Sequence, residues 1–321
     1  MLACVIIQVL KGGMQKTQKN ITLYSHQNSP FEPCEGITVM KQICKRVFTL
    51  SALALAVSAA PQVSAATWSD TYIGYRFGTE FTEPSNDKDI TKHILQFTHA
   101  SGYAYGQNFL NVDLLQSDEN DPASGDVRGE GDGATEAYLT YRHQLHLGKV
   151  FDQDFSFGPV KEVALSAGFD LNTKNTTFGP RKQLLLVGPT LKFAVPKGFL
   201  DFSVFYAHER NRNGFKPAGE RDITFNDYTV YNLAWGLPFN AGPVPMKFQG
   251  FINYNTPKGL GTDDEILARP SLMVDVGDLA FGKSNTLWAG VGYEYWRNKF
   301  GNQGVDGIDT DAPTFQLEWH F

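Results

Sequence analysis

Cysteine is almost missing from this sequence. The 321 residues contain three, Cys4, Cys34 and Cys44, and none follows residue 44. From residue 45 onward the chain therefore has no disulfide, no thiolate metal ligand and no cysteine nucleophile. Cys44 also precedes the apolar run at 47–60 instead of following it, so it is not positioned as a lipidated cysteine.

Long apolar runs are the second absence. A membrane-spanning helix needs about 20 consecutive apolar residues. The run at 47–60 is shorter and is interrupted by Ser51 and Ser58, with Pro61 directly after it. From Ala66 onward no stretch reaches the required length. If this chain crosses a bilayer, it does so without α-helices.

Clusters of basic residues are the third feature that the sequence lacks. The whole chain has 28 Lys and Arg residues against 34 Asp and Glu residues. Residues 1–65 hold six of the basic and two of the acidic residues, so the rest of the chain carries a net charge of about −10. Nucleic-acid phosphates are bound by groups of Lys and Arg. The composition therefore excludes nucleic acid as a partner.

The N-terminal region has the order of a secretory signal peptide. A basic patch, an apolar run and a small-residue cleavage site follow one another; they are formed by Lys41, Lys45, Arg46, 47–60, Val63 and Ala65. We expect a signal peptide at 40–65, cleaved after Ala65 or after Ala66. Residues 1–39 then precede Met40, which opens an ordinary signal. We expect them to be an extension from a start codon assigned too early, or else an extended leader.

Residues 66–321 show alternation with a period of two. In the segment at 163–171 the residues Val163, Leu165 and Ala167 form an apolar row that continues to Leu171, while the intervening row is small or polar. Alternation of this kind occurs in any half-buried strand, including those of a soluble sandwich. About twelve such segments separated by Gly-, Asn-, Asp- and Pro-rich loops are typical of a transmembrane barrel. They lie near 71–79, 91–101, 106–116, 134–147, 160–173, 182–195, 199–210, 223–236, 246–256, 266–277, 287–297 and 313–321.

The sequence therefore predicts a single all-β domain over 66–321, a transmembrane antiparallel β-barrel of about twelve strands in the bacterial outer membrane. An even number of strands returns both ends of the chain to the periplasm. The expected outer loops are 80–90, 117–133, 174–181, 211–222, 257–265 and 298–312, and the clearest inner turn is 196–198. The connection at 148–159 is longer than an inner turn in this scheme.

The last segment carries an aromatic row. Phe315, Leu317, Trp319 and Phe321 alternate with polar residues, and Phe321 is the final residue of the sequence. A terminal aromatic on such a strand resembles the signal that the outer-membrane assembly machinery recognises. We therefore expect that machinery as a partner, with Phe321 as the assembly signal.

Three stretches carry a family resemblance. The segment 154–162 (Asp-Phe-Ser-Phe-Gly-Pro-Val-Lys-Glu) resembles the Tsx-like nucleoside-specific channel family, and 70–78 and 97–113 are similar to that group's first strands. The chain looks like a divergent member. The resemblance implies a monomeric twelve-stranded barrel whose narrow pore passes nucleosides. It implies outer-membrane lipid and lipopolysaccharide as surroundings, no cofactor, no metal and no enzymatic activity.

A nucleoside pore needs aromatic faces for the base and hydrogen-bonding side chains for base edge and ribose. Strand alternation gives the candidate lumen residues as Tyr72, Arg76, Phe109, Asn111, Asp113, Glu136, Tyr138, Arg142, Asp170, Phe251, Asn253, Arg269, Glu294 and Trp296. Mixed aromatics and charges of both signs suit small polar solutes. In a narrow barrel the same charged residues can also form ion pairs that simply fill the lumen. For any single residue this structural interpretation is the simpler one.

Two other functions stay open. Outer-membrane phospholipase A is a twelve-stranded barrel with a His-x-Ser pair on its lipid-facing wall, and His99 and Ser101 match that spacing. Here Gly102 and Tyr103 follow, without the Asn that the phospholipase supplies close in sequence. The second alternative is a non-conducting structural or receptor barrel. The acidic loop at 117–133 is either a solvated loop or a site for divalent cations or a receptor ligand.

Overall fold

The computed structural model describes residues 66–124, 133–176, 179–214, 216–217 and 219–321. The predicted extension, the predicted signal peptide and Ala65 lie outside these residues. Almost all of the described chain is antiparallel sheet. The strands are β1 (Trp68–Phe81), β2 (Ile90–Tyr103), β3 (Gly106–Ser117), β4 (Thr135–His146), β5 (Val160–Lys174), β6 (Gln183–Phe193), β7 (Phe199–Arg212), β8 (Asp222–Thr224), β9 (Tyr228–Ala241), β10 (Val244–Asn255), β11 (Glu265–Ala268), β12 (Ser271–Asp275), β13 (Leu287–Arg297) and β14 (Thr310–His320).

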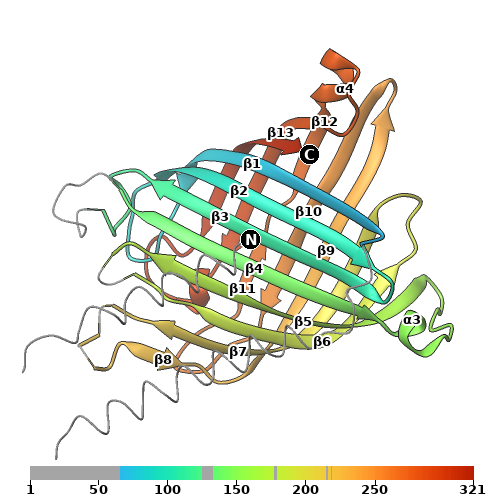
Figure 1. Ribbon diagram of the computed structural model, residues 1–321. Coiled ribbons are helices and arrows are strands. Elements are labelled where there is room, and N and C mark those ends of the chain that lie inside the picture. The colour runs from blue at the N-terminus through green and yellow to red at the C-terminus, as the bar shows by residue number, and fades with distance from the viewer. Residues whose placement is uncertain (1–65, 125–132, 177–178, 215, 218) are drawn as a thin grey trace, which may run out of the picture. The chain divides into compact units, whose positions relative to one another are not determined.

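These fourteen segments make a closed ring of twelve strands (Figure 1). β8 and β9 both pair with β7 and together form one interrupted strand. β11 and β12 likewise share the place between β10 and β13. The ring closes where β1 pairs with β14, in the register Phe77↔Phe315 and Tyr72↔His320. The predicted fold class and strand number are therefore confirmed.

The interruption between β11 and β12 has a local cause. Pro270 has no N–H to donate to the ladder, so the two strands break at Arg269 and Pro270. Opposite the break, Gly250 has φ +153°, and a Cβ there would lie 2.4 Å from the Arg269 carbonyl oxygen. The register of β10 is the same with β11 and with β12, so alternation continues across the break. Arg269 therefore has the inward parity of Leu267 and Ser271 and extends into the lumen.

The outer wall of the barrel is apolar. Large exposed hydrophobic side chains alternate along the strands, for example Leu95 and Phe97 on β2, Leu185 and Val187 on β6, and Val291 on β13. Water cannot satisfy backbone groups in a bilayer, so a sheet that spans it must close on itself. A closed barrel with an apolar outer wall and a polar inside is the architecture of outer-membrane proteins. The described chain is thus a transmembrane β-barrel of the bacterial outer membrane.

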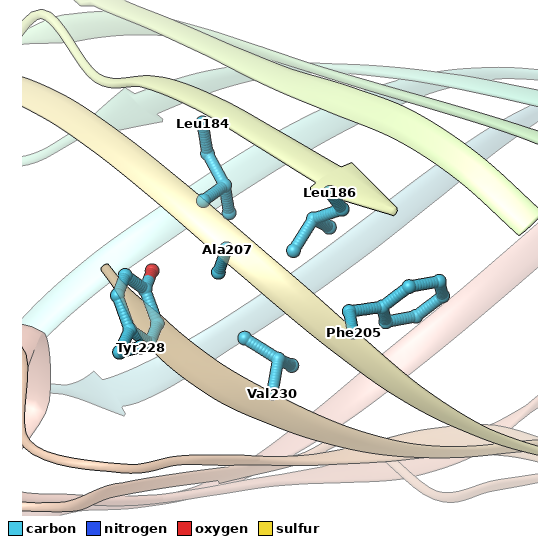
Figure 2. Close-up of a cluster of buried hydrophobic side chains, with 6 residues drawn as sticks. All are labelled: Leu184, Leu186, Phe205, Ala207, Tyr228 and Val230. Carbon is cyan, nitrogen blue, oxygen red and sulfur yellow. The ribbon is translucent and has the colours of Figure 1, made fainter. Parts of the chain in front are cut away.

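The inside is packed at two places by apolar groups. One cluster lies on β6, β7 and β9 and contains Leu184, Leu186, Phe205, Ala207, Tyr228 and Val230 (Figure 2). The other lies where β1 meets β2 and β14 and contains Phe81, Ile90, Ile94 and Ala312, with Leu115 packed against it. These clusters narrow the lumen, as expected for a barrel of only twelve strands.

The two ends of the barrel differ. Connections at one end run over 82–89, 118–134, 175–182, 213–221, 256–264 and 298–309, and those at the other end over 104–105, 147–159, 194–198, 242–243 and 276–286. Longer loops mark the extracellular end of such barrels and shorter turns the periplasmic end. We call these the outer and the inner end, and the chain enters β1 and leaves β14 at the inner end.

Two inner connections contain short helices that the alternation did not predict, α3 (Leu147–Phe151) and α4 (Val276–Phe281). The expected strand at 266–277 was wrong in this respect, because it ends at Asp275, whose side chain accepts a hydrogen bond from the Asp278 amide and caps α4. No helix among the described residues is long and apolar enough to span a bilayer.

Candidate functional site

Every predicted lumen residue lies on the inner face of the wall by strand alternation. The direction of the inner face is defined by Arg76, Asp113 and Glu294, whose side chains are buried inside the ring. The remaining candidates share their parity: Tyr72, Phe109, Asn111, Glu136, Tyr138, Arg142, Asp170, Phe251, Asn253, Arg269 and Trp296. The structure places these residues on the lumen face, and their role in binding a solute stays a prediction.

Four of them form a charge cluster in the middle of the lumen. Arg269 Nε donates to Glu294 at 2.7 Å, and its Nη1 lies 4.0 Å from Asp113 Oδ2. Arg76 Nη2 donates to the same Asp113 oxygen at 3.2 Å. We call Arg76, Asp113, Arg269 and Glu294 the central cluster. It joins β11–β12 to β3 across the inside of the ring, and its two positive and two negative charges balance.

Neutral donors extend the central cluster. Gln96 and Asn111 each donate a side-chain N–H to Asp113 Oδ1, at 3.2 and 2.8 Å. The Phe251 ring lies beside the guanidinium of Arg269, 5.8 Å from centroid to Cζ. A carboxylate held by two arginines and two amides is fixed in place. The cluster is therefore a rigid polar bridge.

A second group lies on β4 and β5. Arg142 Nη1 donates to Asp170 Oδ1 at 2.6 Å, and the Tyr138 hydroxyl donates to the other oxygen of Asp170 at 3.1 Å. Asp113 pairs with Tyr138 in the β3–β4 register, so this group neighbours the central cluster along the wall. With it the middle of the lumen contains three arginines and three carboxylates.

Phe109 differs from its neighbours on the inner face. It pairs with Arg142 on β4 and Ala100 on β2, and 39% of its surface is exposed. Other large aromatics of the inner wall, such as Tyr138 and Trp296, have their polar atoms hydrogen-bonded to carboxylates. Phe109 thus presents an accessible aromatic face next to a guanidinium.

At the outer end of the lumen, ion pairs link the strands to the loops. Lys92 and Lys299 contact Glu83 Oε1 at 2.6 and 3.4 Å. Burial alone would raise the pKa of Glu83, but the ammonium groups of Lys299 and Lys92 outweigh it and hold that pKa below its ordinary value. On the neighbouring wall Asn172 donates to Glu136, and Lys174 contacts Asp121 at 2.8 Å.

Trp296 belongs to this outer layer. Its Nε1 donates to Glu265 at 2.7 Å, the Lys299 ammonium lies 4.5 Å from its ring, and the Phe300 ring packs edge-on at 5.1 Å. Protein groups therefore already contact this ring. Trp296 is better placed to fix the loop at 298–309 than to stack a solute.

At the inner end Tyr72 packs against His320, with ring centroids 4.8 Å apart. His320 Nδ1 lies 2.7 Å from Asp70 and its Nε2 3.3 Å from Glu318. Lys247 donates to Glu318 at 2.5 Å and lies 4.6 Å from the Trp288 ring. Lys247, Trp288 and Glu318 were not among the predicted candidates, although their strand parity identifies them.

The segment that carries the family resemblance, 154–162, lies at the inner end of the barrel. Residues 154–159 belong to the inner connection after α3, and 160–162 begin β5. The bridge Phe157↔Val160 joins the two parts, and the Phe157 ring is exposed. His99 and Ser101 lie on the outer wall, as alternation predicts, and His99 Nδ1 is bonded to Thr71 Oγ1 at 2.7 Å. The described residues hold no group of His, Cys, Asp and Glu that fits a metal ion.

No family model and no curated protein matches this chain. Solved structures with a related outline include the KdgM porin in complex with disordered oligogalacturonate, at 11% identity and a TM-score of 0.39 over 78% of this chain and 99% of that one. The NanC porin has 8% identity and a TM-score of 0.40 over 78% and 99%. The translocator domain of the autotransporter NalP from Neisseria meningitidis has 12% identity and a TM-score of 0.38 over 90% and 100%. Similarity this low leaves the solute to be inferred from the residues of this chain alone.

Proposed function

We propose that this barrel is a channel for the diffusion of small polar solutes across the outer membrane, and that nucleosides are the solutes it passes. The observation that best supports this proposal is the exposed ring of Phe109 on the inner wall, next to Arg142. A solute with a flat base and a hydroxylated sugar matches an aromatic face beside polar side chains. Stacking on one aromatic contributes about 1–3 kcal/mol, weak enough for release.

The charges of the lumen support an uncharged solute. Arg76, Arg142 and Arg269 are each within 4.0 Å of a carboxylate, and no arginine of the middle layer is left over to attract anions. A pore for anions would instead present unpaired guanidinium groups. Paired charges leave hydrogen-bonding edges for hydroxyl and amide groups without a strong preference for either sign of ion.

The barrel offers a matched test. Phe109 on β3 faces the lumen and Phe97 on the neighbouring β2 faces lipid, with exposed fractions of 39% and 41%. We expect nucleosides to reduce single-channel current in planar bilayers. Phe109→Ala should weaken this block by about tenfold, the scale of one lost stacking contact, and Phe97→Ala should leave it unchanged.

Three results would count against the proposal. If nucleosides do not reduce the single-channel current, nucleosides are rejected as the solute class. Equal effects of Phe109→Ala and Phe97→Ala reject the lumen as the selective surface. A folded barrel without conductance rejects the channel and leaves a structural or receptor barrel.

A further inference from the structure

A groove of about 510 Å³ lies on the outer wall of the barrel, across four neighbouring strands. Its floor is Ala167 on β5, which pairs with His143 on one side and with Val187 on the other. Tyr141, Phe169, Leu185 and Tyr206 form its apolar walls. Ala167 is small among large neighbours, and this is why the wall is hollowed there.

The outer end of the groove meets polar groups. His208 is part of the lining, and its Nδ1 lies 2.7 Å from Asp227 Oδ1. The Tyr206 hydroxyl donates to the other oxygen of Asp227. A charged group on a lipid-facing wall is expensive unless it lies near the interface. The groove therefore runs from the apolar region of the wall to the headgroup level of the outer leaflet.

Three arginines stand above the groove. Glu209 is buried in the lumen, so Arg210 and Arg212 share the outer face with His208. Arg210 is two residues beyond His208, about 7 Å along the strand. Arg181 lies two residues before Gln183, the partner of Arg210 in the β6–β7 register.

These arginines form no ion pair with any carboxylate of the residues that the structure describes. Among the described residues none of Arg181, Arg210 and Arg212 has a carboxylate within 4.0 Å. The Arg212 Nη1 atom is buried without a hydrogen-bond partner. The other outer-wall arginine near this end, Arg297, contrasts with them, because it donates to both oxygens of Asp311 at 2.9 and 2.7 Å.

The rim at the outer ends of β1–β3 has a different charge balance. Its exposed acidic residues, Glu80, Asp87, Asp89 and Glu119, outnumber the exposed Lys88. The β6–β8 side also has exposed acidic residues, Glu220, Asp222 and Asp227, but its three arginines are unpaired. An anionic headgroup at the outer leaflet therefore meets unpaired guanidinium groups directly above the groove.

We propose that the groove and its three arginines form a binding site for lipopolysaccharide, with its acyl chains against the apolar walls and its phosphates on Arg181, Arg210 and Arg212. Several unpaired guanidinium groups match a lipid with more than one phosphate, since Arg binds phosphate in a forked geometry. The groove crosses four strands, so an acyl chain can lie along its apolar walls. A phospholipid with one phosphate uses only part of the site.

The experiment titrates detergent-solubilised, heat-modifiable protein with lipopolysaccharide, and separately with phosphatidylglycerol, and follows bound lipid by native mass spectrometry. Arg181→Gln/Arg210→Gln removes two charges, and Ala167→Phe fills the groove with the charges in place. Arg297→Gln is the control, because it removes an outer-wall arginine that is already paired. All four substituted side chains lie on the outer wall, so folded yields should stay comparable.

We expect the double variant to bind lipopolysaccharide at least about tenfold more weakly, since each surface charge contributes about 1 kcal/mol to anionic-lipid binding. Ala167→Phe should also weaken binding, and Arg297→Gln should match the unaltered protein. Unchanged affinity in the double variant overturns the proposal. So does an equal affinity for phosphatidylglycerol, which reduces the site to a general anionic-lipid contact, and so does an equal loss in Arg297→Gln.

Discussion

Arg269 and Asp113 meet across the lumen, with Nη1 and Oδ2 4.0 Å apart, although β13, β14, β1 and β2 separate their strands in the ring. Asp113 also accepts from Arg76, so one carboxylate neutralises two guanidinium groups. This contact connects opposite parts of the wall at mid-height. A single charge change at Asp113 therefore acts on two guanidinium groups at once.

Replacing Asp113 with Asn should shift the channel toward anions. The amide keeps the shape but leaves Arg76 and Arg269 with only Glu294 between them. One charge at a partly desolvated site changes the preference by about 1 kcal/mol or more, roughly fivefold in the permeability ratio. Reversal potentials in asymmetric salt measure it. Asp154→Asn, on the exposed inner connection, is the control, and a shift as large there would place selectivity outside the central cluster.

Replacing Trp296 with Leu should destabilise the outer end without changing nucleoside block. The Trp296 ring is covered by Lys299 and Phe300, so its loss frees the loop at 298–309 and leaves no stacking face missing from the pore. A lowered melting temperature with unchanged block is the expected pair of results. Weakened block at normal stability would instead make Trp296 a solute contact.

An arginine at Val291 should cost about 2–4 kcal/mol if the site lies near the bilayer midplane. Val291 is 62% exposed on the outer wall of β13, so the guanidinium would face lipid. Reversible unfolding in lipid vesicles gives the free energy. The same substitution at Val305, in an outer loop, should cost little, and equal costs at both sites would move Val291 off the membrane-facing surface.

Replacing Phe321 with Ser should lower the yield of folded barrel while the free energy of unfolding stays nearly constant. The Phe321 ring is 70% exposed and its ring contact is with Trp319, at 6.4 Å. Little packing is lost, so any drop in yield reports recognition during assembly. The fraction of heat-modifiable protein in cells is the measurement. Normal yield would remove Phe321 from the assembly signal.

The outer ion pairs predict a pH dependence. A carboxylate whose pKa is lowered contributes its stabilisation in full above its ordinary pKa of 4.5, and loses it progressively as pH falls from there through the lower value. As far as Glu83 is concerned, the melting temperature should therefore stay constant between pH 7 and about pH 5 and fall below that. Lys299→Met removes one of the two ammonium attractions and raises the pKa of Glu83 in the folded protein, so the acid loss should be smaller and should end at higher pH. The same acid profile in both proteins would contradict this role for Lys299.

Strand alternation predicted the faces of the wall because side-chain direction has a period of two wherever lipid and lumen differ. Arg142 and Asp170 could thus both be assigned to the lumen face from the alternation of their own strands. The break at Pro270 and the helix after Asp275 were not predicted, because both depend on single residues that interrupt a pattern read over about ten. The contact of Arg269 with Asp113 was not predictable either, since it depends on how the ring closes.

The outer-wall groove could not be predicted from the sequence for a similar reason. Ala167, Val187 and Tyr206 lie on three strands, and nothing local in the sequence places them in one row. In the sequence alone, Arg210 cannot be distinguished from an ordinary solvated residue near a loop, because its neighbours on other strands are not known. The register between strands, more than the content of any strand, determines which residues gather there.

The seam between β1 and β14 has a consequence for the order of folding. His320 and Asp70, hydrogen-bonded across it, are 250 residues apart in sequence, and closing so long a loop is entropically unfavourable until the intervening hairpins have formed. Hairpins therefore form first and the seam last. Until that moment both edge strands have unpaired backbone groups that lipid cannot solvate. A chain that lacks the final strand therefore has no closed form that is stable in the membrane, because β1 and β13 keep unpaired edges.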